Sequence, residues 1–83
     1  MEHYFNIDVF YDDKIIQFSA ALQDFTLHYR IVIYVWEHIV YFEPDEERNF
    51  RAVVENPLSR AKIPSDLLQL IAIELLKIFH PCG

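Results

Sequence analysis

The sequence predicts an α+β fold, in which a five-stranded antiparallel β-meander over residues 3–54 is covered on one face by a C-terminal α-helix over residues 65–79. Three observations lead to this prediction. Side chains alternate with period two through the first two-thirds of the chain, which is typical of strands. The last quarter has the apolar spacing of an amphipathic helix. The links between the strands are too short for the crossovers that parallel strands need.

The first two strands are predicted over residues 3–10 and 14–22. The better-buried face of the first strand holds Phe5, Ile7 and Val9. In the second strand, one side holds Ile16, Phe18, Ala20 and Leu22, and the other holds Ile15, Gln17, Ser19 and Ala21. Asp12-Asp13, between the two runs, favours a turn because a short Asp side chain hydrogen-bonds to its own backbone.

The third strand, over residues 25–36, has the clearest alternation. The face expected to lie against the helix holds Phe25, Leu27, Tyr29, Ile31, Ile33 and Val35. The opposite face holds Thr26, His28, Arg30, Val32, Tyr34 and Trp36. Because β-branched and aromatic residues dominate both faces, this segment suits a pleated sheet.

Two shorter strands complete the predicted meander, over residues 39–43 and 50–54, with a polar turn between them. Residues 55–64 are expected to be a connector. Ser65 or Asp66 is expected to cap the helix at its start. Pro81 and Gly83 are expected to end it.

Length, charge and cysteine content restrict the class of protein. The 83 residues predict a single domain over residues 1–83. The net charge is −6 and the basic residues are scattered, which disfavours binding to nucleic acid or to an anionic membrane. One cysteine, Cys82, allows no internal disulfide, and the N-terminal residues lack the pattern of a signal peptide. A cytoplasmic location is therefore expected.

Catalytic and cofactor motifs are missing from the sequence. The only glycine is Gly83, whereas loops that closely approach phosphate need glycine. The P-loop, the dinucleotide fingerprint and the nucleophile elbow are therefore absent. The four histidines and Cys82 fall at no zinc-ligand spacing, and His80-Pro81-Cys82 is interpreted as a frayed helix end. We expect no enzyme activity, no cofactor and no metal, although a catalytic triad assembled in space stays open.

The acidic pairs and runs in the sequence allow two interpretations. Asp12-Asp13 and Asp45-Glu46-Glu47 would suit either a divalent-cation site or solvated turns. Adjacent charges on a loop repel one another and hydrate, and no ordered ligand pattern accompanies them. The sequence therefore favours solvated turns.

A candidate binding face is predicted on the side of the third strand away from the helix, comprising His28, Arg30, Tyr34 and Trp36. Such a mixture of aromatic and basic side chains can stack on a base, a sugar or a proline-rich peptide. The same residues could instead be ordinary cross-strand pairs on a half-exposed face. Trp36 should be partly accessible to solvent, and an exposed Trp beside a turn is the best single indication of a binding surface.

The predicted helix also indicates self-association. Its apolar side chains form a broad arc that can pack on the sheet, but Leu70 and Ile73 lie among the polar residues opposite. Two apolar neighbours on one exposed face favour a contact, and a two-fold dimer would place that face against its own copy. An edge strand or the aromatic sheet face should contribute to the same homodimer, because two side chains per chain bury little area.

These observations predict a small, non-catalytic, intracellular interaction module that self-associates or docks on another protein. The alternative is a small-ligand-binding protein, or an enzyme subunit whose site forms between chains. An interaction module should have an exposed apolar patch and no cleft, whereas a ligand-binding protein should have a concave pocket on which His28, Arg30 or a carboxylate converges.

Overall fold

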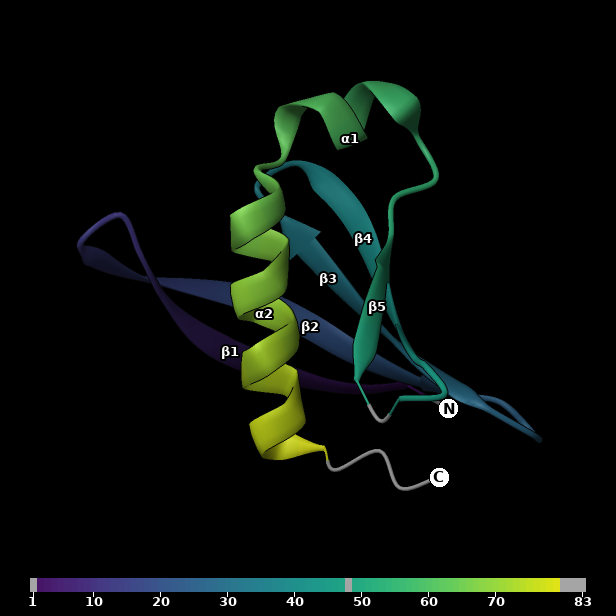
Figure 1. Ribbon diagram of the computed structural model, residues 1–83. Coiled ribbons are helices and arrows are strands. Elements are labelled where there is room, and N and C mark those ends of the chain that lie inside the picture. The colour runs from purple at the N-terminus through teal and green to yellow at the C-terminus, as the bar shows by residue number, and fades with distance from the viewer. Residues whose placement is uncertain (1, 48, 80–83) are drawn as a thin grey trace.

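The structure is a computed structural model that describes residues 2–47 and 49–79. The strands are β1 (Glu2–Tyr11), β2 (Lys14–Asp24), β3 (Tyr29–Val35), β4 (His38–Pro44) and β5 (Phe50–Val53), and the helices are α1 (Pro57–Lys62) and α2 (Ser65–Ile78). The strands form one open antiparallel sheet in the order β1-β2-β3-β4-β5, with α2 across one face (Figure 1). The predicted α+β class, the meander and the C-terminal helix are confirmed.

The β1–β2 hairpin is regular along its whole length. Its register runs without a break from Glu2 opposite Gln23 to Tyr11 opposite Lys14. The two turn residues, Asp12 and Asp13, have φ angles of 54° and 61°. Two positive φ angles define a type I′ turn, whose twist matches that of the flanking strands and which tolerates Asp.

The third strand begins at Tyr29, four residues later than the alternation predicts. Residues 25–28 form a loop instead, in which the N–H of Phe25 donates to the carbonyl of His28 at 2.8 Å. Phe25 and Leu27, which were expected to face the helix, are exposed, and Leu27 is 92% exposed. The register explains the error: Asp24 pairs with Tyr29, so the chain must reverse within four residues.

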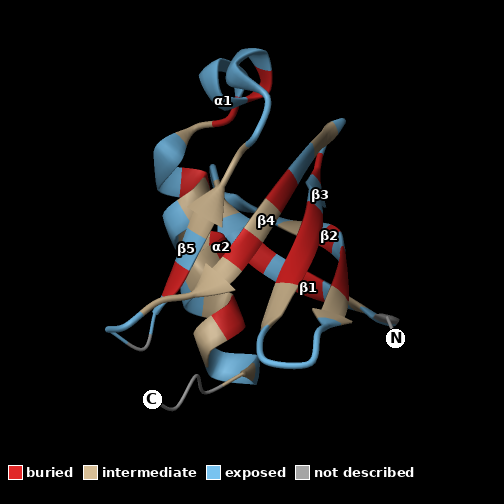
Figure 2. Cartoon of the chain, turned by 90° about the vertical axis from the view of Figure 1, so that its right-hand side faces the viewer, coloured by how far each residue is buried: buried red, intermediate tan, exposed pale blue. Residues whose placement is uncertain are grey.

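The core lies between the sheet and α2. The fully buried side chains are Phe42, Ile31, Ile33, Leu67, Ile71, Leu75, Val9, Val35 and Val40. Those of α2 follow one another at four-residue intervals, which places them on one helix face. Figure 2 shows the longest run of buried residues along β3, the central strand of the sheet. The face of the sheet that packs on α2 is the inner face, and the opposite one is the outer face.

The segment between β5 and α2, predicted as a connector, contains the short helix α1. Asn56 caps it, since the side-chain oxygen of Asn56 accepts from the N–H of Leu58 at 3.0 Å. Pro57, at the first helical position, lacks an N–H that would otherwise be unsatisfied. Both signals are present in the sequence.

The start of α2 also differs from the prediction. Pro64 occupies the N-cap position without a side-chain cap, so Ser65 and Asp66 lie inside the helix. Asp66 places its charge in the first turn and accepts a hydrogen bond from the Tyr11 hydroxyl at 3.3 Å. Burial, followed by the negative charge of Asp66, raises the pKa of the Tyr11 hydroxyl above its ordinary value. This contact joins the end of β1 to the start of α2.

At its other end, α2 stops at Phe79, whose N–H donates to the carbonyl of Leu75 at 2.7 Å. Pro81 and Gly83, which were expected to end the helix, lie outside the described residues. Over residues 2–47 and 49–79, no helix has the length and apolar character required to span a bilayer.

Candidate binding site

The outer face of the sheet carries several large apolar side chains that are exposed to solvent. The exposed ones are Tyr4, Phe10, Ile15, Tyr34 and Ile39, joined by Trp36 in the β3–β4 turn. Tyr34 and Ile39 are direct cross-strand neighbours, 52% and 46% exposed. Together with Trp36 they form an apolar group at one end of the sheet.

Trp36 has an unusual backbone. It is 53% exposed, as predicted, and has a φ angle of 58° in the turn between Val35 and His38. For a bulky side chain this left-handed conformation is a genuine outlier, and it costs about 1–2 kcal/mol. A glycine at this position would avoid the cost. The backbone strain thus coincides with an exposed aromatic side chain.

We expect Trp36→Gly to be more stable than Trp36→Ala by about 1 kcal/mol. Both variants lose the same indole contacts, but only glycine relieves the left-handed backbone. At a strand or turn position with a negative φ angle, a glycine variant is less stable than the alanine variant. Urea denaturation followed by far-ultraviolet circular dichroism measures the difference. Equal stabilities, or a more stable alanine variant, would show that the turn is not strained.

Arg30, a second predicted binding residue, is held within the outer face itself. Its guanidinium carbon lies 4.1 Å from the ring centre of Tyr41 and 5.5 Å from that of Phe25. Its Nε donates to Oε1 of Gln23 at 2.7 Å. These cation–π contacts and this hydrogen bond fasten the β2–β3 loop to the sheet.

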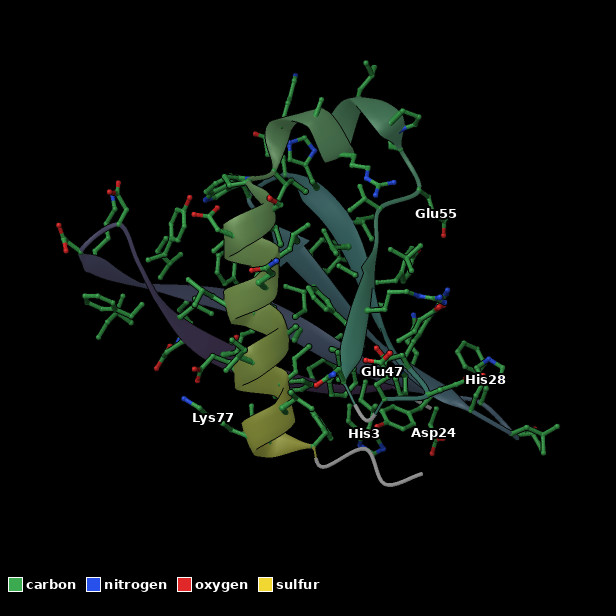
Figure 3. The ribbon with its side chains drawn as sticks, viewed as in Figure 1. His3, Asp24, His28, Glu47, Glu55 and Lys77 are labelled. Atoms are coloured by element: carbon green, nitrogen blue, oxygen red, sulfur yellow. The ribbon has the colours of Figure 1, made fainter. Side chains whose placement is uncertain are left out.

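The four predicted binding residues separate into two groups. His28 lies in the β2–β3 loop, where its ring stacks on Phe25 with 4.8 Å between ring centres (Figure 3). His28 and Arg30 are therefore at the beginning of β3, while Tyr34 and Trp36 are at its end. The structure brings the members of each pair to the same end of the strand, and keeps the two pairs apart.

A pocket of about 280 Å³ adjoins the Trp36 turn. It is lined by Glu37, His38, Ile39, Tyr41, Glu55, Asn56 and Ser59. It forms because β5 pairs with β4 only as far as Tyr41, after which the chain leaves the sheet for α1. Figure 3 shows Glu55 on this departing segment, between β5 and α1. Ile39 belongs both to the pocket and to the apolar group with Trp36.

One polar contact in the pocket was not predictable from the sequence. Nδ1 of His38 lies 2.8 Å from Oγ of Ser59, although the two residues are 21 positions apart. A serine hydroxyl within reach of a histidine is the first requirement for a nucleophile. Ser59, however, is only 8% exposed. Its burial favours a structural role, in which this hydrogen bond fastens α1 to β4.

The acidic turn after β4 uses its first carboxylate for backbone contacts. Oδ1 of Asp45 accepts from the N–H groups of Glu47 and Asn49, each at 2.9 Å. This arrangement is an Asx turn. Within the part of the chain that the structure describes, no three His, Cys, Asp or Glu residues are grouped so as to hold a metal ion. His80 and Cys82 lie outside that part.

The two helix residues predicted to mediate self-association differ in exposure. Ile73 is 48% exposed, whereas Leu70 is partly buried against the core. Ile78, the last residue of the helix, is 50% exposed. The exposed face of α2 thus offers less apolar surface around position 70 than the helical spacing suggested.

Comparisons of the chain with protein-family models, with curated proteins and with solved structures find no match.

Proposed function

We propose that this protein is a non-catalytic interaction module that binds another protein through the Trp36 site, which comprises Tyr34, Trp36, Ile39 and the adjoining pocket. The observation that supports this proposal is the half-exposed indole of Trp36 on a left-handed backbone. Trp and Tyr are enriched among the few interface residues that supply most of the binding energy. The proposed site contains one of each, beside an apolar neighbour.

The charge of the site indicates the kind of partner. Two carboxylates, Glu37 and Glu55, line the pocket beside Trp36, and the whole chain carries a net charge of −6. The indole face also attracts a cation. The partner is therefore a protein segment that carries a Lys or Arg side chain next to apolar residues. The pocket is slightly smaller than typical small-ligand sites but large enough for one long side chain.

The same proposal places the module in the cytoplasm. A secreted domain of this size usually depends on internal disulfides, which a single cysteine cannot form. The small-ligand alternative would use the same pocket, with His38 and Ser59 as its polar groups. The exposed Trp36 favours the protein partner, because an aromatic residue outside the pocket adds nothing to the enclosure of a small molecule.

The test is selection from a random peptide display library, followed by titration. We expect the selected peptides to be enriched in Lys or Arg beside apolar residues. Binding should shift the emission of Trp36, the only tryptophan in the chain. Trp36→Ala should weaken binding about tenfold or more. The Glu37→Gln/Glu55→Gln variant should weaken it severalfold at low salt and less at high salt.

Leu27→Ala is the matched control, because Leu27 is the most exposed of the large apolar residues and lies in the distant β2–β3 loop. Its affinity for the selected peptides should equal that of the unaltered chain. Peptides without basic residues, or peptides that bind Trp36→Ala as tightly as the unaltered chain, would contradict the proposal.

A further inference from the structure

We propose that β1 pairs antiparallel with β1 of a second copy, so that one continuous sheet extends across two chains. This inference rests on the proposed function as an interaction module, but it uses a different surface from the Trp36 site. The partner in self-association is an identical chain, and the contact is made by the residues of the two β1 strands.

The first argument is the unprotected edge of the sheet at β1. Natural edge strands are kept from pairing by short length, by charged side chains, Lys above all, by Pro, by a bulge, or by a covering helix or loop. β1 is ten residues long, has no Lys or Pro, pairs with β2 without a break, and carries a single charge, Asp8, in its middle. On its other side lies no further strand within the described residues. Since hydrogen-bonding residues alternate along an antiparallel strand, every second residue of β1 turns its N–H and C=O away from β2.

The opposite edge, β5, shows the protection that β1 lacks. It is only four residues long, and its outer face carries Arg51, which pairs with Glu43 at 3.2 Å. The chain then turns away at Asn56 and Pro57. One edge of this sheet is therefore closed to strand addition and the other is open.

The second argument is that β1 is complementary to itself. A two-fold axis perpendicular to the sheet places the outer faces of the two chains on the same side. The outer-face residues of β1 are the even-numbered ones, so an even-numbered residue of one β1 must lie opposite an even-numbered residue of the other. When the axis passes through Ile7, Tyr4 lies opposite Phe10 and Asn6 opposite Asp8. Tyr4 and Phe10 are 77% and 66% exposed in the single chain. In the dimer, the two-fold symmetry creates two equivalent Tyr4–Phe10 pairs, in which each ring covers the other. Aromatic cross-strand pairs of this kind stabilise a sheet.

The neighbouring registers are worse. An axis at Asn6 places Tyr4 opposite Asp8, which leaves the aromatic ring of Tyr4 beside a carboxylate. An axis at Asp8 places Asp8 opposite its own copy, and like charges directly opposite are destabilising. The pattern of aromatic and charged residues along β1 thus selects the register centred on Ile7.

The experiment is sedimentation or light scattering across a dilution series, with the full chain carrying Cys82→Ser to prevent disulfide artefacts. We expect a dimer. Asn6→Asp places a carboxylate opposite Asp8 at two symmetric positions and should weaken the dimer about threefold to tenfold. Asn6→Lys should strengthen it by a similar factor, because Lys then faces Asp8. The double variant Asn6→Asp/Asp8→Lys should restore the dimer, since the opposite charges are exchanged.

Ser19→Asp is the matched control. Ser19 is exposed on the outer face and lies directly opposite Asn6, but on the interior strand β2. It should leave the dimer unchanged within a factor of two. A monomer at high micromolar concentration would overturn the proposal. So would a dimer that both Asn6 variants weaken, or one that neither changes.

The failure of the β1 pairing and the failure of the Trp36 site can be told apart. Trp36→Ala should keep the dimer, and Asn6→Asp should keep the affinity for basic peptides. A monomeric chain that still binds those peptides overturns the β1 pairing alone.

Discussion

Replacement of Phe42 by alanine is expected to lower the free energy of unfolding by about 3–5 kcal/mol. Phe42 is completely buried in the middle of β4, opposite Ile31 on one side and Ala52 on the other. Removal of its ring loses apolar burial and leaves a cavity that the two flanking strands keep open. In a chain this small the loss is a large part of the total stability.

Urea denaturation followed by far-ultraviolet circular dichroism checks this prediction. The matched control is Ile39→Ala, three residues earlier on the same strand but on the outer face, where Ile39 is 46% exposed. It should cost less than about 1.5 kcal/mol, because only part of the side chain leaves water on folding. Similar losses at positions 39 and 42 would show that both faces of the sheet are covered.

Ile71→Glu should have a still larger effect and prevent cooperative folding. Ile71 is fully buried between Leu67 and Leu75 on the face of α2 that packs on the sheet. A carboxylate there has no partner, and the burial of an unpaired charge costs several kcal/mol beyond the lost apolar contact. We expect a chain without a cooperative thermal transition, measured by circular dichroism.

Ile73→Glu, two residues further along α2, is the control. Ile73 is 48% exposed, so a charge at this position stays hydrated and the fold should persist. The same variant separates the two models of self-association. Pairing through β1 predicts a dimer that Ile73→Glu leaves intact, whereas an interface on Leu70 and Ile73 predicts a monomer.

Alternation in the sequence predicted the sheet because each strand has two different faces. It failed at residues 25–28, where the alternating pattern continues through a loop. Phe25 is apolar there for another reason: its ring contacts Arg30 and stacks on His28. Side-chain contacts of this kind leave no periodic signal in the sequence.

The helix α1 was missed because six residues are too few to show a helical period. Its only signals are the cap at Asn56 and the proline that follows. A capping pair alone is common at turns, so it becomes informative only when the surrounding segment is known to be helical.

The candidate site was predictable only in part. The partial exposure of Trp36 was predicted from its alternation out of phase with the inner-face residues of the third strand, and it is confirmed, although Trp36 lies in the turn after β3 and not in the strand itself. The pocket beside it depends on where β5 stops pairing with β4, and on the contact between His38 and Ser59. Both are tertiary features, set by segments far apart along the chain.

The connectivity of the meander has a consequence for synthesis on the ribosome. Every strand pairs with its neighbour in sequence, so each hairpin can form as soon as its second strand emerges. The helix that covers the inner face is translated after all five strands. At about 5–20 residues per second, its 14 residues take about 1–3 s to add. During that interval the apolar inner face of the nascent sheet has no cover, and the open edge of β1 is already available to a neighbouring chain on the same messenger.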